Sequence, residues 1–198
     1  MRGDYAETNH FSDRLAGVVA PLVEGRMTTR QLIVVTCAYL VELVAVVYFT
    51  RATSHRIVGA LAGGAAVGCM GLGVIALGNA LGLWRVPISW TPYFLALFYL
   101  GLVISVTPIY LVTWRVVRRF GWRGLAVCLG VVAIIGPPRD YLIAAKFPEW
   151  MVFAPGVAPI LADAATYVGI VVLGHAVMRL IAGPAREDRL ARRPWETA

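Results

Sequence analysis

Long apolar runs dominate the chain, and short segments rich in arginine, proline and polar residues separate them. The first three runs cover about residues 32–50, 57–81 and 92–114. A helix of about 20 apolar residues crosses the hydrocarbon core of a bilayer. Each of these runs therefore predicts one transmembrane helix.

The fourth run is shorter and ends at Pro137 and Pro138. Residues 124–136 make a helix of about 20 Å, which is less than the roughly 30 Å thickness of the hydrocarbon core. Prolines remove backbone donors and disfavour helical backbone just before them. Two interpretations stay open: the helix kinks and continues, with Arg139 and Asp140 at membrane depth, or it breaks and the following residues lie along the interface.

The last apolar stretch, residues 150–182, contains Pro155, Pro159 and Asp163 in its first half. A regular helix is therefore predicted only from about residue 164 to residue 182. The segment before it is expected to be bent or re-entrant, since prolines interrupt regular helices.

These runs predict an all-α fold: a polytopic membrane bundle of about five transmembrane helices with a proline-broken fourth helix. The bundle covers residues 31–182, after a polar and amphipathic segment (1–30) and before a basic tail (183–198). Composition agrees, because 59% of the residues are hydrophobic and 15% are charged. Soluble domains average about 45–50% apolar and about 25% charged residues, and disordered chains have low hydrophobicity, so both classes are excluded.

The chain carries 18 Lys and Arg against 11 Asp and Glu, a net charge of +7. In a soluble protein this excess of positive charge suggests a nucleic-acid partner. Here the arginines cluster at the ends of apolar runs, where such residues determine membrane topology and contact lipid head groups. No nucleic-acid partner is predicted. Seven cations fall on the N-terminal side of the predicted bundle and eleven on the other side. The positive-inside rule therefore places the C-terminus in the cytoplasm and the N-terminus outside a cell membrane.

The positions of the tryptophans alternate between the two predicted membrane surfaces. Trp84, Trp90 and Trp150 fall in segments assigned to one membrane surface, and Trp114 and Trp122 fall in segments assigned to the other. Tryptophan is enriched at both membrane–water interfaces. This alternation favours five crossings.

Ionisable and polar side chains within the apolar runs are the candidates for chemistry, because such groups are costly in a membrane. Glu42 lies about ten residues into the first run. Its carboxyl group is expected to act as a proton donor, as a charge partner inside the bundle, or as a structural hydrogen-bonding group. The catalytic candidates are Glu42, Asp140 and Asp163; the substrate-binding candidates are Arg139, Tyr141, Tyr167 and His175. For His175, a role in helix packing is the favoured alternative.

The densest polar cluster is residues 136–141, Gly-Pro-Pro-Arg-Asp-Tyr. The prolines leave backbone carbonyls that lipid cannot satisfy, and the guanidinium of Arg139 suits a carboxylate or phosphate. If the chain folds back near residues 147–150, Asp163 comes within reach of Arg139. The cluster is then either a ligand site or a structural Arg–Asp bridge.

Glycines recur along the second run, with three GxxxG pairs between residues 59 and 82. Such faces let helices approach closely, so this face is expected to pack against a helix of the same chain, or to contact a second copy or another membrane subunit. The three cysteines, Cys37, Cys69 and Cys128, are far apart, and no metal-binding motif is present. No metal and no cofactor are predicted.

Three functions remain. The first is a small membrane-embedded enzyme that uses acid/base chemistry on a lipophilic substrate: an isoprenoid, a sterol-like molecule or a lipid. The second is a non-catalytic accessory or scaffold subunit of a membrane complex, which the glycine face and the small size suggest. The third is a proton-coupled transporter, which the absence of an internal repeat disfavours.

Overall fold

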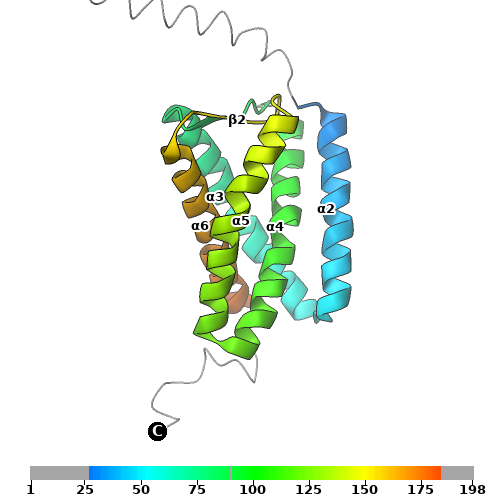
Figure 1. Ribbon diagram of the computed structural model, residues 1–198. Helices are drawn as coiled ribbons and strands as arrows, with labels where there is room; N and C mark the ends of the chain where they lie inside the picture. The colour runs from blue at the N-terminus through cyan, green and yellow to red at the C-terminus, as the bar shows by residue number, and fades with distance from the viewer. Residues whose placement is uncertain (1–26, 90, 184–198) are drawn as a thin grey trace, which may run out of the picture.

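The computed structural model describes residues 27–89 and 91–183 (Figure 1). This part of the chain contains five long helices and one two-stranded sheet: α2 (Thr29–Thr50), α3 (Ser54–Ala80), β1 (Trp84–Arg85), α4 (Pro92–Phe120), α5 (Trp122–Lys146), β2 (Val152–Phe153) and α6 (Val157–Ala182). All five helices are long and apolar enough to cross a membrane. The predicted all-α, multi-pass membrane bundle is confirmed. Most of the N-terminal segment and nearly all of the basic tail lie outside the described residues.

Local sequence explains where the helices begin and end. A capping box starts α2: Gln31 N donates to Thr28 Oγ1 at 3.2 Å, and Thr28 N donates to Gln31 Oε1 at 2.8 Å. Pro92 stands at the start of α4, where its missing N–H costs nothing. Gly121, with φ of 61°, makes the turn between α4 and α5.

The prolines of α5 and α6, the fourth and fifth described helices, have different positions within their helices. α5 runs without a break through Pro137 and Pro138 to Lys146, which settles the first open alternative in favour of a continuous helix. Packing against neighbouring helices lets a membrane helix tolerate such prolines. The expectation of a bent or re-entrant segment up to about residue 164 is wrong, because α6 begins at Val157. Pro159 falls in the first turn of α6, where backbone N–H groups have no intrahelical partner.

The glycine face of α3 packs inside the chain. A Cβ atom at Gly63 would lie 2.5 Å from the carbonyl oxygen of Gly174 on α6, and one at Gly64 would lie 2.9 Å from the carbonyl oxygen of Val103 on α4. Farther along α3, the indole of Trp84 covers Gly78. These contacts use much of the glycine face within the chain, as one of the two alternatives expected; contact of this face with a second copy or another subunit stays a prediction.

The bundle is arranged around α4. α4 contacts α2, α3, α5 and α6, whereas α2 packs mainly against α4 and lies at the periphery. The start of α2 and the end of α6 lie at opposite ends of the bundle (Figure 1). Strands β1 and β2 pair antiparallel, Trp84 opposite Phe153, and join the α3–α4 and α5–α6 connections at the end where α2 begins.

The outer surface of the bundle is apolar, as a lipid-facing surface must be. Val41 is 70% exposed and Leu180 84% exposed. Cations gather at the end opposite the β1–β2 sheet: the Arg56 guanidinium lies 3.8 Å from the Trp114 ring centroid, and Arg115 donates to the Thr50 carbonyl at 2.9 Å. The described tryptophans alternate between the two ends of the bundle as predicted, but Trp84 and Trp114 are buried rather than placed in a surface belt.

Candidate functional site

A cavity of about 280 Å³ lies among all five helices and is called here the inner cavity. Its volume is near the lower end of the roughly 300–1,000 Å³ typical of small-molecule sites. Most of its wall is apolar, with side chains from α2, α3, α4 and α6 such as Val35, Ile75, Phe98, Leu102 and Ile170. Polar side chains lie along part of the wall and come from four helices: Thr36, Tyr39, Ser105, Arg139, Asp140, Asp163, Thr166 and Tyr167.

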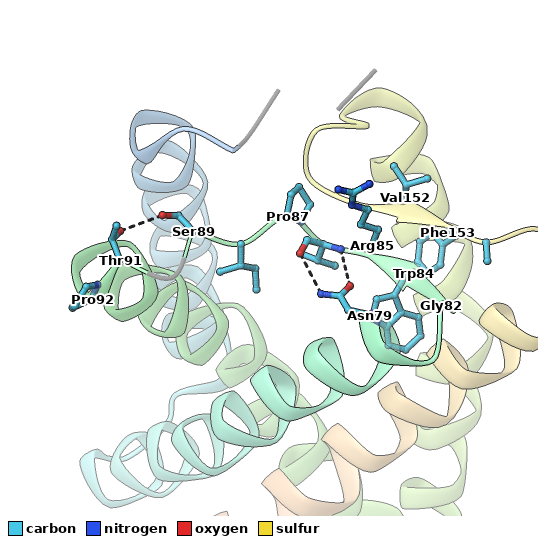
Figure 2. Close-up of a pocket in the computed structure, with 13 residues that line it drawn as sticks. Asn79, Gly82, Trp84, Arg85, Pro87, Ser89, Thr91, Pro92, Val152 and Phe153 are labelled. Carbon is cyan, nitrogen blue, oxygen red and sulfur yellow. Dashed lines mark hydrogen bonds between the residues drawn. The ribbon is translucent and has the colours of Figure 1, made fainter. Parts of the chain in front are cut away.

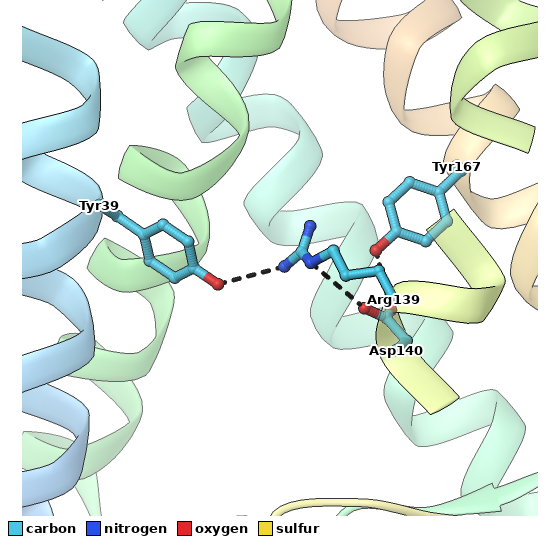
Figure 3. Close-up of polar contacts among 4 residues, drawn as sticks. All are labelled: Tyr39, Arg139, Asp140 and Tyr167. Atoms are coloured by element: carbon cyan, nitrogen blue, oxygen red, sulfur yellow. Dashed lines mark hydrogen bonds and ion pairs between the residues drawn. The ribbon is translucent and has the colours of Figure 1, made fainter. Parts of the chain in front are cut away.

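Arg139 organises one side of this wall (Figure 3). Its Nη2 donates to the Tyr39 hydroxyl on α2 at 3.1 Å, and its Nε lies 3.7 Å from Asp140 Oδ1. The Tyr167 hydroxyl donates to Asp140 Oδ2 at 2.9 Å. A guanidinium, a carboxylate and two phenols thus link α2, α5 and α6. Asp140 Oδ2 accepts a hydrogen bond and Oδ1 lies in an ion pair, so the carboxylate is held in place by its neighbours.

Asp163 contributes a second carboxylate to the inner cavity. Its side chain is only 5% exposed, and its Oδ2 has no hydrogen-bond partner among the described residues. Asp163 interacts electrostatically with Asp140 and Arg139, so the three ionisable groups form one cluster. A buried polar atom without a partner is unusual in a folded protein and marks a position where a ligand or water can bind.

Three more buried polar atoms on the wall of the inner cavity share this property. They are Thr36 Oγ1, Trp84 Nε1 and Trp150 Nε1, and none has a hydrogen-bond partner in the described part of the chain. Because the four residues come from α2, β1, the α5–α6 connection and α6, the folded bundle alone brings them together. Thr36 Oγ1 lies against Gly101 and the Trp84 indole nitrogen lies against Gly78, so Asp163 Oδ2 and Trp150 Nε1 remain as the atoms to pair with a bound molecule.

Small residues and helical spacing set the geometry of the site. Asp163 and Tyr167 are four residues apart and so lie on one face of α6. Gly136 on α5 lies directly against the Tyr167 ring, and any side chain at this position would collide with it. The missing side chain lets α5 approach α6 closely enough for Tyr167 to reach Asp140.

The structure unites four of the seven predicted site residues: Asp140, Asp163, Arg139 and Tyr167 all line the inner cavity. The other three do not line this cavity. Glu42 is exposed on α2. Tyr141 stacks on Phe153 at a centroid distance of 4.1 Å, although it also interacts electrostatically with Asp163. His175 is buried about 18 Å along α6 from Asp163.

Further polar or aromatic residues of the site were not predicted, among them Thr36, Tyr39, Trp84 and Trp150. Thr36 and Tyr39 are polar groups within the first apolar run, and their spacing of three residues places them on one helix face. That spacing was an available signal. The two tryptophans were predicted only as interfacial anchors, and nothing in the sequence indicates that they line a cavity.

A second hollow, called here the outer depression, lies at the end of the bundle beside the β1–β2 sheet (Figure 2). It is open, has a volume of about 1110 Å³, and includes the exposed Arg85. The Asn79 side chain shapes it by accepting from Val86 N at 2.9 Å and donating to Val86 O at 3.4 Å. Trp84 and Val86 line both hollows, so they form the partition between the outer depression and the inner cavity.

Comparison of the chain with protein-family models, with curated proteins and with solved structures finds no match. Within residues 27–89 and 91–183, no three His, Cys, Asp or Glu side chains lie close enough together to hold a metal ion.

Proposed function

We propose that this protein is a small membrane-embedded enzyme that uses acid/base chemistry on a lipophilic substrate bound in the inner cavity. The observation that carries the proposal is the Asp163 carboxylate, buried in a largely apolar cavity with Oδ2 unpartnered. Proton transfer by a positioned carboxyl group requires such an oxygen within hydrogen-bond reach of the substrate. Asp163 is accordingly the proposed catalytic residue.

The neighbouring residues are assigned positioning roles. Asp140 accepts from Tyr167 and pairs with Arg139, so its oxygens are less available to a substrate than Asp163 Oδ2. Arg139 in turn contacts Tyr39. This network fixes one charged wall of the inner cavity, and fixed charges in a poorly solvated site interact strongly with charge that develops during a reaction.

The proposal is tested by comparing the lipid profiles of cells that express the wild-type chain, Asp163→Asn or Glu42→Gln. Asp163→Asn keeps the shape of the side chain but removes its ability to take a proton. Because general acid/base catalysis contributes about 10²–10⁴-fold to rate, this variant is expected to abolish the lipid change that the wild-type chain causes.

Glu42→Gln is the matched control, because Glu42 does not line the inner cavity, and it is expected to behave as the wild type. Equal amounts of each variant in the membrane must be verified by immunoblot. A lipid profile that Asp163→Asn and Asp140→Asn both leave unchanged contradicts the proposal.

The proposed orientation places the N-terminal side of the bundle outside the cell. Its support is the clustering of cations at the end opposite the β1–β2 sheet, including Arg51, Arg56, Arg115 and Arg119, because cationic loops favour the cytoplasm. The inner cavity then lies nearer the outer surface, beside the β1–β2 sheet.

A second candidate function, a subunit of a larger membrane complex, is favoured by Glu42. Its carboxyl group is exposed near the middle of α2, between the exposed Ala38 and Ala45. A carboxyl facing lipid at this depth is costly, and a helix of another subunit with a hydrogen-bond donor would relieve that cost.

For this second function, the wild-type chain is expected to elute with a partner after extraction in mild detergent, and Glu42→Ala is expected to release that partner. Val41→Ala, at the neighbouring and equally exposed position, is the control and should keep it. Size-exclusion chromatography with light scattering measures the mass of each. A wild-type chain that elutes as a single monodisperse monomer excludes this function.

A further inference from the structure

We infer that the inner cavity binds a neutral lipophilic alcohol, with the hydroxyl group of the ligand directed to Asp163. The inference rests on the proposed function, since it names the substrate class of the same site. Its basis is two buried polar atoms of residues that line the cavity, Asp163 Oδ2 and Trp150 Nε1, which lack a hydrogen-bond partner within the described chain.

These two atoms define the polar group that complements them. Asp163 Oδ2 requires a donor, and the indole Nε1 of Trp150 requires an acceptor. A hydroxyl group has one donor hydrogen and two acceptor lone pairs. It can therefore donate to Asp163 and accept from Trp150. An ether or ester lacks the donor, and an ammonium group lacks the acceptor.

The charges on the wall disfavour an anionic head group. The lining of the inner cavity contains one cation, Arg139, and two acids, Asp140 and Asp163. Arg139 is already engaged by Tyr39 and Asp140. Phosphate sites commonly use arginine to form two parallel hydrogen bonds, and Asp163 would repel a phosphate. An alcohol is therefore favoured over its phosphate ester.

The rest of the wall suits a hydrocarbon body. Burial of apolar surface contributes roughly 25 cal/mol per Å², and the side chains facing the cavity away from the acids are mostly aliphatic or aromatic. Arg139 both lines the cavity and has a side chain that is 46% exposed. The opening of the cavity is therefore assigned to the Arg139–Tyr39 contact between α2 and α5, through which a membrane-dissolved tail can extend into lipid.

The test uses the full chain in phosphatidylcholine nanodiscs, labelled by a photoreactive diazirine analogue of farnesol. Farnesol, farnesyl methyl ether and farnesyl phosphate compete for labelling. Leaving a buried polar group without its partner costs about 1–3 kcal/mol, or about fivefold to 150-fold in affinity. Farnesol is therefore expected to compete at least about fivefold better than either analogue. Asp163→Ala is expected to remove the preference for farnesol over the ether, and Glu42→Gln is expected to keep it.

An ether or phosphate that competes as well as farnesol overturns the inference, as does an Asp163→Ala variant that keeps the wild-type preference. The comparison of the three competitors on the wild-type chain needs no variant to fold. Selective binding of farnesol with a lipid profile insensitive to Asp163→Asn contradicts the proposed enzyme but not this inference. A lipid change that requires Asp163, together with tighter binding of the phosphate, contradicts only the inference.

Discussion

Gly63→Leu is expected to prevent correct assembly of the bundle, whereas Gly73→Leu on the same helix is expected to be tolerated. At Gly63 even the first side-chain atom would lie 2.5 Å from the backbone oxygen of Gly174, and backbone in a packed helix cannot move aside as a side chain can. Inserting extra carbon atoms into a packed core costs about 1–3 kcal/mol or more. At Gly73 a Cβ atom meets nothing within 4 Å.

The measurement is the fraction of protein that remains monodisperse after extraction in mild detergent, together with the midpoint of thermal unfolding. Gly63→Leu is expected to lower both sharply, and Gly73→Leu is expected to match the wild type. Equal behaviour of the two variants would falsify the close crossing of α3 and α6, because the substitution is the same and only its surroundings differ.

Gly136→Ala is expected to reduce activity strongly while the bundle still forms. The added methyl group would meet the Tyr167 ring, so the ring must move and its hydrogen bond to Asp140 Oδ2 is lost or weakened. A hydrogen bond to a charged group contributes about 1.5–3 kcal/mol, which corresponds to a loss of about tenfold to 150-fold if Asp140 must be held in place for turnover. The readout is the lipid change described above.

Two further variants show whether a loss of activity in Gly136→Ala comes from the Tyr167–Asp140 contact. Gly130→Ala on the same helix is the control, because a Cβ atom at that position meets nothing within 4 Å. Tyr167→Phe removes the hydroxyl alone and is expected to reduce activity in the same direction. Full activity in Gly136→Ala and Tyr167→Phe would show that the Tyr167–Asp140 contact has no part in catalysis.

Much of the fold could be predicted from the apolar runs, since crossing a bilayer requires a minimum length of apolar helix. The first three helices lie close to their predicted ranges. The errors came from prolines, whose effect depends on position: Pro159 is harmless in the first turn of α6, and Pro137 and Pro138 are accommodated inside α5. The sequence contains the prolines but not the packing that accommodates them.

The candidate site could be predicted in part. Arg139 and Asp140 are adjacent in the chain, and Tyr167 follows Asp163 by one helical turn, so local spacing was informative. The position of Glu42 could not be predicted in this way. It is near the middle of an apolar run, but the direction in which its side chain faces depends on the rotation of α2 against α4. In the folded bundle Glu42 is exposed. That rotation depends on contacts of Leu32, Thr36 and Leu43, the buried residues of α2, with distant parts of the chain.

The close crossing of α3 and α6 has a consequence for biosynthesis. Among the described helices, α6 leaves the ribosome last, yet it covers Gly59 and Gly63 of the second helix to be made. Until α6 is inserted, these two glycines have no packing partner within the described chain, and the Asp163 wall of the inner cavity does not exist. Nascent chains that stop before Val157 should therefore remain exposed to membrane quality-control proteases, whereas chains that include α6 should become resistant.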